Sequence, residues 1–240
     1  MKMKLDIHAF GAHPDDVELS AAGTLLNQIE LGHKVGIIDL TRGELGTRGS
    51  AEIRDQEAAA AAEIMGIHAR ENLELADGHF EDNTESRLEV IRMLRKYQPD
   101  IVLANAIKDR HPDHGRGAKM VAESCFLAGL IKIETRDNGV LQDRWRPRLV
   151  YHYIQDMNIE PDFVVDISQH MEKKVEAIKA YGSQFFDPKS TEPTTYIASK
   201  QFLDNIYSRA MEAGRSARFQ YGEGFTVHRP VAVKDITALH

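Results

Sequence analysis

Residues 5–40 of this chain, LDIHAFGAHPDDVELSAAGTLLNQIELGHKVGIIDL, decide its fold class. Residues 5–10 and 34–40 are short apolar runs, which are typical of buried strands. Residues 16–31 carry apolar side chains four positions apart, on one stripe of a helix, at Val17, Ala21, Leu25 and Ile29. Gly32 then terminates the helix pattern. A strand, a helix and a second strand in this order predict two parallel strands covered by the helix.

The same alternation continues along the chain. Apolar runs predict further strands, and stretches rich in helix formers predict further helices; the strands are residues 72–75 and 100–106, and the helices 51–65, 85–97 and 117–130. Strands buried on both faces form a parallel sheet between layers of helices. We therefore expect an α/β, Rossmann-like fold over residues 1–240, as one domain with a mostly parallel open sheet and helices on both faces.

The last third of the chain is less regular and predicts a C-terminal elaboration of this fold. Residues 149–154 and 163–167 have the pattern of strands. Ser168 is placed to cap a helix that runs through residues 171–178. A further helix is expected over residues 199–213, followed by an irregular tail.

Composition excludes several classes of protein. The 240 residues include 30 Lys and Arg against 37 Asp and Glu, a net charge of −7, which argues against a nucleic-acid or membrane partner. The single Cys125 excludes an internal disulfide and a cysteine-rich zinc site. We find no signal-peptide pattern and no apolar run near the roughly 18 residues of a membrane span, so we expect a cytoplasmic protein.

Two short motifs carry candidate chemistry, and each follows a predicted strand. The first is GAHPDD at residues 11–16, and the second is HPDH at residues 111–114. Open α/β sheets bind ligands beyond the carboxyl ends of their strands, where both motifs are expected to lie. Neither G-x-G-x-x-G nor G-x-x-x-x-G-K-[ST] occurs, so the sequence does not indicate a nucleotide site.

The spacing within the motifs indicates a metal site. His13 and Asp16 are three residues apart, as are His111 and His114, so each pair can converge on one ion. Two imidazoles and one carboxylate are usual ligands of a catalytic zinc, and Asp15 would be free to accept a proton from water. The alternative is that the Asp-Asp pair only caps a helix and that HPDH is a surface loop. Finding both motifs at strand ends of one sheet favours the metal site.

These motifs resemble those of the PIG-L/LmbE-like zinc-dependent N-acetylglucosamine deacetylases. Further matches are the TRGE turn at residues 41–44, the R-x-x-E pattern at 54–57 and the DG pair at 77–78. The resemblance implies a hydrolase that cleaves an acetamide, with three zinc ligands, namely His13, Asp16 and His114. It also implies Asp15 as general base, His111 as the group that stabilises the oxyanion, and Asp113 as the carboxylate that orients a histidine.

Within the family, the chain is most similar to the bacillithiol-biosynthesis deacetylases, which act on N-acetylglucosaminyl malate. This likeness rests on LTRGELGTRGS at residues 40–50 and DRHPDHG at 109–115. Malate has two carboxylates, and the planar fork of arginine suits a carboxylate. The resemblance thus predicts substrate contacts by Arg54 and Arg110, with Asp77 and Glu44 on sugar hydroxyls or behind the metal ligands.

Several points stay open at this stage. Mycothiol-pathway relatives carry a tyrosine just before the second motif, where this chain has Asp109-Arg110, so the completion of the oxyanion site is undecided. The same ligands hold Fe²⁺ as well as Zn²⁺. Free or oligomeric N-acetylglucosamine, or another N-acetylglucosaminyl conjugate, is an alternative substrate. A non-catalytic sugar- or metal-binding module is an alternative of another class. The resemblance implies a small-molecule substrate and a homo-oligomer, with a hexamer as one form.

Overall fold

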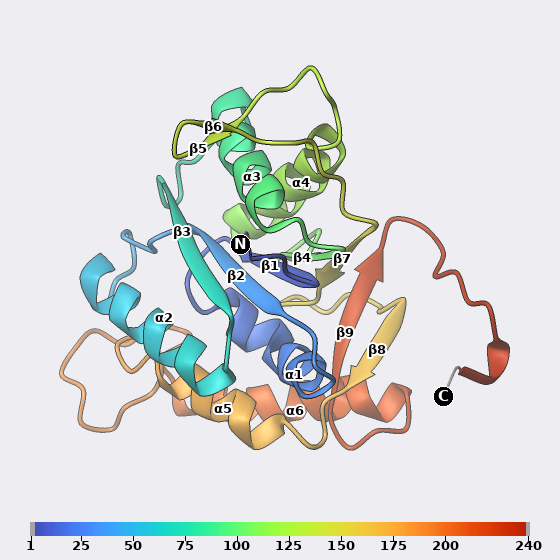
Figure 1. The fold of residues 1–240 in the computed structure, drawn as a ribbon. Coiled ribbons are helices and arrows are strands. Elements are labelled where there is room, and N and C mark those ends of the chain that lie inside the picture. The colour runs from blue at the N-terminus through green and yellow to red at the C-terminus, as the bar shows by residue number, and fades with distance from the viewer. Residues whose placement is uncertain (1–2, 239–240) are drawn as a thin grey trace.

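The computed structural model describes residues 3–238 and contains a seven-stranded sheet (Figure 1). The strand order is β3-β2-β1-β4-β7-β9-β8, and the first five strands in this order are parallel. The strands are β1 (Ile7–Gly11), β2 (Val35–Thr41), β3 (Ala69–Leu75), β4 (Ile101–Ala104), β7 (Leu149–Tyr153), β8 (Phe163–Asp166) and β9 (Gly222–Val227). A separate hairpin pairs β5 (Arg136–Asp137) with β6 (Val140–Leu141).

Helices cover both faces of the sheet, which confirms the predicted fold class (Figure 1). One layer holds α3 (Thr84–Tyr97) and α4 (Pro112–Leu127), and the other holds α1 (Asp16–Glu30), α2 (Ala51–Met65), α5 (Met171–Lys179) and α6 (Lys200–Ser216). A short 3₁₀ helix, η1 (Ile236–Ala238), ends the described chain. Among the described residues, no helix has the length and apolar character needed to cross a membrane.

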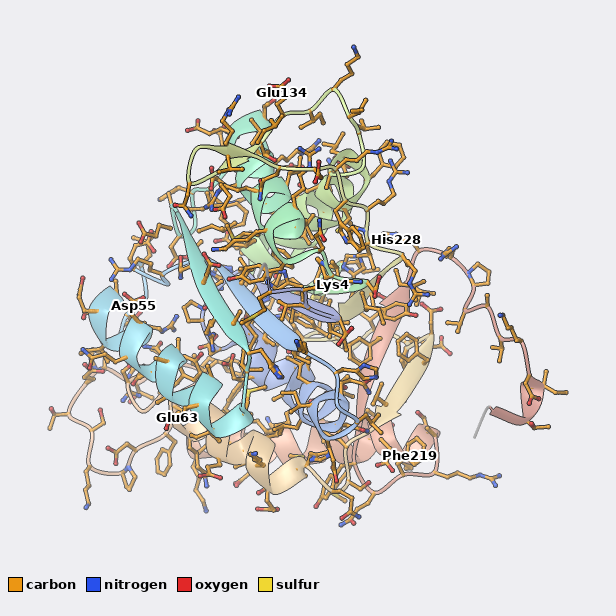
Figure 2. The ribbon with its side chains drawn as sticks, in the orientation of Figure 1. Lys4, Asp55, Glu63, Glu134, Phe219 and His228 are labelled. Carbon is orange, nitrogen blue, oxygen red and sulfur yellow. The ribbon has the colours of Figure 1, made fainter. Side chains whose placement is uncertain are left out.

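Alternating side chains of the central strands fill the two cores. Phe10 and Ile38 pack with α3 and α4, whereas Ala9 and Ile37 pack with the apolar stripe of α1. In α2 the residues Arg54, Ala58, Ala61 and Met65 are buried, while the labelled side chains of Asp55 and Glu63 lie on its outer face (Figure 2). Burial of one helix face therefore turns Arg54 toward the interior.

The tail predicted to be irregular contains β9, which inserts between β7 and β8 and is antiparallel to both. Glycines weaken the strand signal of this segment in the sequence. In the structure they permit close packing, because a Cβ on Gly222 would lie 2.5 Å from the Val164 side chain and 2.9 Å from Gly214 of α6. The same glycine that obscures the strand in the sequence therefore lets α6 approach it.

Two local predictions are also corrected, and one hairpin was not predicted. The helix predicted over residues 117–130 begins at Pro112, because proline suits the first helical position and His111 caps the end. Ser168 does not cap α5; its hydroxyl donates to Asp166 Oδ1 at 2.6 Å, and His170 is the N-cap residue. The β5–β6 hairpin was missed, although its Asn138-Gly139 turn, with both φ angles positive, is a common hairpin signal.

Candidate active site

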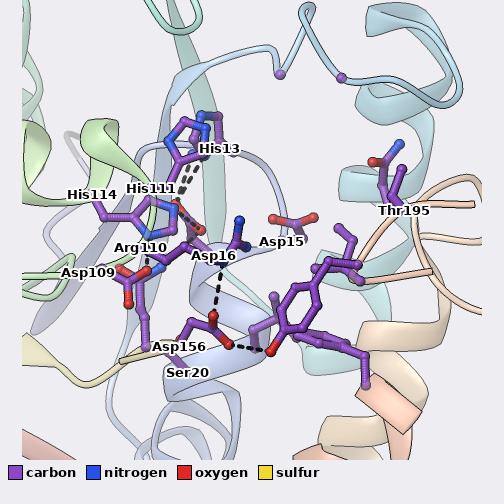
Figure 3. Close-up of a pocket in the computed structure, with 18 of the residues that line it drawn as sticks. His13, Asp15, Asp16, Ser20, Asp109, Arg110, His111, His114, Asp156 and Thr195 are labelled. Carbon is purple, nitrogen blue, oxygen red and sulfur yellow. Dashed lines mark hydrogen bonds and ion pairs between the residues drawn. The ribbon is translucent and has the colours of Figure 1, made fainter. Parts of the chain in front are cut away.

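The two motifs meet because β1 and β4 are parallel neighbours and end at the same edge of the sheet. The first motif joins β1 to α1, and the second motif caps and opens α4. Three imidazoles gather there (Figure 3). The ring centre of His13 lies 4.6 Å from that of His111 and 5.5 Å from that of His114. Residues about 100 positions apart thus form one cluster.

Asp16 lies between two of these imidazoles. Its Oδ2 is 3.6 Å from Nδ1 of His13, and its Oδ1 is 3.1 Å from Nε2 of His114. The opposite nitrogens face other carboxylates: His13 Nε2 lies 2.9 Å from Asp77 Oδ1, and His114 Nδ1 lies 2.5 Å from Asp109 Oδ2. In metal-binding histidines, a carboxylate that accepts the N–H of the nitrogen not bound to the metal fixes the orientation of the ring. It also makes the other nitrogen a stronger metal ligand.

Two overlapping groups have donor atoms close enough to hold one ion. In each group all the donor atoms lie within 4.8 Å of one another; the groups are His13, His111 and His114, and His13, Asp77 and Asp113. Asp77 and Asp113 approach the Nε2 side of His13, at 2.9 and 3.5 Å, which leaves its Nδ1 side to Asp16. The imidazole and carboxylate donors gathered here suit a divalent transition-metal ion. Asp16 belongs to neither group, although it lies 3.6 Å from His13 and 3.1 Å from His114 through different oxygens, so its role as a metal ligand stays a prediction.

Protons compete with a metal ion for the same ring nitrogens. Burial lowers the pKa of His114, but the charge of Asp16 and the hydrogen bond with Asp109 outweigh it and raise the value to about 9. His13 is likewise buried, yet hydrogen bonds with Asp113, Asp16 and Asp77 raise its pKa well above the usual 6.5. An ion that binds through these nitrogens would therefore compete with protons, which makes its affinity depend on pH.

Asp15 is the N-cap residue of α1, but its side chain makes no capping hydrogen bond. Its φ of 114° is unusual for a residue other than glycine, and such strain is often found at functional sites. Burial raises the pKa of this carboxyl to about 7, although Arg54 opposes the shift with its Nη2 3.5 Å from Oδ2. A carboxyl group near pKa 7 can both accept and return a proton at neutral pH.

His111 occupies the N-cap of α4, and its Nδ1 accepts a hydrogen bond from the Asp113 N–H at 3.3 Å. Burial and the neighbouring His13 and His114 lower the pKa of His111, so the neutral ring is favoured. With Nδ1 acting as acceptor, the proton of the neutral ring lies on Nε2. This geometry makes His111 a hydrogen-bond donor rather than a cation.

A pocket with a volume of about 370 Å³ opens over these residues (Figure 3). Arg54 and Arg110 both line it, and their contact with a substrate stays a prediction. Arg54 is buried and its Nε has no hydrogen-bond partner among the described residues. Arg110 is half exposed and donates to Asp156 at 3.0 Å. Arg209 of α6 also lies 3.7 Å from Asp156, so two rim cations share one carboxylate.

Other predicted contacts lie further from the pocket interior. Asp77 lines the pocket but is engaged by His13 and by the Leu45 N–H at 2.9 Å. Glu44 is exposed and is not among the described residues that line the pocket. Its carboxylate accepts a hydrogen bond from the Asp77 N–H at 2.8 Å. Glu44 thus holds the loop that carries Asp77, and its contact with a sugar hydroxyl stays a prediction.

Four neighbours of the site were not identified as site residues from the sequence. Asp109 holds His114, Asn105 and Gln155 donate to Asp16, and Asp156 joins Arg110 to Arg209. Asp109 is next to the second motif, and its position after a predicted strand was a usable signal. Gln155 and Asp156 follow β7, so only the pairing of β7 with β4 brings them near the motifs.

Comparison with known proteins places this arrangement in a family. The model of the GlcNAc-PI de-N-acetylase (PIG-L) family matches residues 8–125, which include both motifs. The diacetylchitobiose deacetylase of Thermococcus kodakarensis is 30% identical over 72% of this chain and 67% of that protein. A probable N-acetyl-alpha-D-glucosaminyl L-malate deacetylase of Bacillus anthracis is 26% identical over 72% of this chain and 78% of that protein.

Among solved structures, the conserved protein TT1542 from Thermus thermophilus is similar over almost its whole length. The two chains are 31% identical, with a TM-score of 0.86, and the match covers 97% of this chain and 98% of the other. The match therefore includes the C-terminal strands and helices that lie outside the family model. This chain belongs to the GlcNAc-PI de-N-acetylase (PIG-L) family.

Proposed function

We propose that this protein is a zinc-dependent hydrolase that removes the N-acetyl group from an N-acetylglucosaminyl conjugate, and that the conjugate is the malate glycoside used in bacillithiol synthesis. One observation supports a hydrolytic reaction. The buried carboxylate of Asp15, which makes no capping hydrogen bond to α1, lies beside His13, Asp16 and His114. The named activities of the two curated relatives support an acetamide as the bond that is cleaved.

Two imidazole nitrogens and one carboxylate are the donors of many catalytic zinc sites. A bound ion supplies a Lewis acid and lowers the pKa of water toward about 7. The chain's own residues must then position the acetyl group, move protons and stabilise the charge that develops on the carbonyl oxygen.

Asp15 is the proposed base. Its side chain lines the pocket, and burial raises its pKa to about 7, so it can take the proton of the attacking water. The same proton is then available to the departing amine, which leaves poorly without it. Arg54, at 3.5 Å, favours the ionised form of Asp15 and so keeps the base active near neutral pH.

His111 is the proposed hydrogen-bond donor to the oxyanion. Its Nδ1 is occupied by the Asp113 N–H, which directs the proton of the neutral ring to Nε2. The ring lines the pocket, and a preorganised donor at this place stabilises negative charge that forms in the transition state.

The distribution of positive charge supports an anionic group on the substrate. Arg54 lies inside the pocket with Nε unpaired among the described residues, and Arg110 and Arg209 at the rim have Asp156 as a shared counter-ion. Arginine binds carboxylates with two parallel hydrogen bonds. Because five aspartates also line the pocket, the preference for malate over a neutral disaccharide rests on the position of these arginines and not on a net positive charge.

The proposal is tested by acetate release from N-acetylglucosaminyl malate, N,N′-diacetylchitobiose and N-acetylglucosamine, using zinc-loaded protein. We expect the malate conjugate to be preferred and Asp15→Asn to reduce turnover by about 100-fold or more with zinc content unchanged. Asp204→Asn, at an exposed position of α6, is the matched control and should keep full activity.

If the two neutral substrates are hydrolysed as fast as the malate conjugate, the protein is still a deacetylase but the malate assignment is wrong. No acetate from any of the three, with zinc bound, would favour the non-catalytic binding module. Within the malate assignment, Arg110→Met should raise KM for the conjugate by about tenfold, the effect of losing one charged hydrogen bond, and leave KM for diacetylchitobiose unchanged.

A further inference from the structure

The carboxylate of Asp16 is held by three uncharged donors. Its Oδ2 accepts the His13 N–H at 3.0 Å and the Asn105 side-chain amide at 2.9 Å, and its Oδ1 accepts the Gln155 side-chain amide at 3.0 Å. A carboxylate has about four acceptor positions. Three are filled by these donors, and the remaining one lies toward His114, whose Nε2 is 3.1 Å from Oδ1.

The two amides form one rigid unit, which we call the amide clamp (Asn105 and Gln155). Gln155 Oε1 accepts from the Asn105 side chain at 3.0 Å and from the Ala106 N–H at 3.1 Å, so its amide nitrogen must face Asp16. Both side chains are buried, at 0% and 4% exposure. The backbone oxygen of Asn105 is itself bonded to His152 Nδ1 at 2.8 Å, which ties the clamp to β7.

We propose that Asn105 and Gln155 are positioning residues that make Asp16 present a single acceptor position to the metal ion. This inference rests on the metal site proposed above. Because the donors are neutral, they orient the carboxylate without cancelling the charge that attracts a cation. An arginine or lysine in the same place would give equal orientation but would offset that charge.

The clamp also explains why these residues are amides rather than hydrophobic residues at the junction of three strand ends. Asn105 follows β4, Gln155 follows β7, and Asp16 follows β1 through the first motif. Their hydrogen bonds cross the carboxyl edge of the sheet, where the backbone ladders no longer join the strands. Loss of the Asn105 amide frees a position on Oδ2, which can then reach the ion as a second ligand atom, whereas loss of the Gln155 amide removes a restraint on Oδ1 itself.

The test uses Gln155→Leu and Asn105→Ala in the full-length protein, with Gln142→Leu as control. Gln142 is also a buried amide, but its side chain donates to the Arg92 carbonyl at 3.0 Å, far from the pocket lining. Zinc affinity is measured by competition with a chromophoric chelator. Loss of a group that orients a metal ligand typically lowers affinity by about 10- to 100-fold, which we expect for the two clamp variants only.

A cobalt spectrum separates positioning from general stability. Visible d–d bands of Co²⁺ weaken as its coordination number rises, so the freed Oδ2 of Asp16 should reduce their intensity in Asn105→Ala, while Gln142→Leu keeps the wild-type spectrum. Thermal unfolding of the metal-free proteins is recorded in parallel. Wild-type affinity and spectrum in both clamp variants, or a loss of affinity equalled by Gln142→Leu, would overturn the inference. If the wild type itself binds no zinc, the metal site proposed above fails instead.

Discussion

Nη2 of Arg54 lies 3.5 Å from Oδ2 of Asp15, and both side chains are buried. This pair links α2 to the N-terminus of α1 and places a cation against the proposed base. Opposite charge at this distance favours the ionised carboxylate, whereas burial favours the neutral acid. The balance between the two effects decides how much Asp15 is available as a base at neutral pH.

Arg54→Met should therefore lower kcat by about tenfold or more on both the malate conjugate and diacetylchitobiose, because the base is common to the two reactions. Arg54→Lys, which keeps a cation, should recover part of the loss. Steady-state kinetics on the two substrates measure this. An unchanged kcat on both substrates, with a rise in KM restricted to the malate conjugate, would show that Arg54 acts only on the substrate carboxylate and not on Asp15.

Asp109 is expected to control metal affinity through His114. In the structure, Asp109 Oδ1 accepts the Met157 N–H at 2.7 Å, and Asp109→Asn keeps an oxygen for this bond. The variant presents an amide group, in place of a carboxylate oxygen, to Nδ1 of His114. We expect zinc affinity to fall by about 10- to 100-fold, measured by chelator competition. Asp162→Asn is the control, because Asp162 also accepts a backbone N–H, that of Val227, away from the pocket. Equal losses in the two variants would contradict the assignment.

Glu223 of β9 is expected to be a main determinant of stability. It is buried, accepts the N–H groups of Gly23 and Thr24 at 3.0 and 2.7 Å, and pairs with Lys174 at 2.6 Å. Glu223→Gln leaves the Lys174 cation buried without its charge partner. We expect the free energy of unfolding to fall by about 3–5 kcal/mol, measured by urea denaturation.

The double variant Glu223→Gln/Lys174→Met should be more stable than Glu223→Gln alone, because it removes the unpaired charge. Glu212→Gln, in an exposed pair with Arg215, should leave the unfolding midpoint unchanged. If the stability losses of Glu223→Gln and Lys174→Met simply add in the double variant, the two residues do not act as a buried pair. Lys174 would then be solvated in Glu223→Gln.

His8 should make the protein less stable in mild acid. Its ring nitrogens have no hydrogen-bond partner among the described residues, and burial lowers its pKa from 6.5 to about 3. The unfolded chain takes up a proton below about pH 6.5, and the folded chain does so only near pH 3. Stability from this residue is thus complete above pH 6.5 and is lost as the pH falls toward 3.

Between pH 7 and pH 5 the loss from His8 should be about 2 kcal/mol. Urea denaturation at the two pH values, for wild type and His8→Leu, isolates this contribution, because the leucine variant lacks it. His79→Leu, at an exposed position, should follow the wild type. The same pH dependence in His8→Leu and wild type would show that other groups cause the acid sensitivity.

The central sheet and the two motifs could be predicted because their signals are local. Apolar runs, the stripe on α1 and the glycine ends of helices depend on neighbouring residues, and parallel strands bring their carboxyl ends to one edge. The three metal-ligand candidates and Asp15 belong to these short motifs, and the structure brings them together (Figure 3). The second motif was also placed correctly after a strand, although the helix that follows was predicted to begin five residues later than it does.

The surroundings of the site could not be read in the same way, because they depend on contacts between distant segments. Gln155 reaches Asp16 across 139 positions of sequence, and Asn105 reaches it across 89. Strand β9 carries two glycines that weaken its local signal, and it forms only because β7 and β8 pair with it on both sides. Pairing of this kind has no signature in a single sequence.

The α/β class, the position of both motifs at strand ends and the types of side chain gathered at the site follow from the sequence alone. The chemistry of which those side chains are capable depends on the tertiary structure. Burial raises the pKa of Asp15 to about 7, the Asp113 N–H directs the proton of neutral His111, and the amide clamp leaves one acceptor position on Asp16. Chemical groups are encoded locally, whereas their desolvation and hydrogen-bond partners arise from packing between segments far apart in the chain.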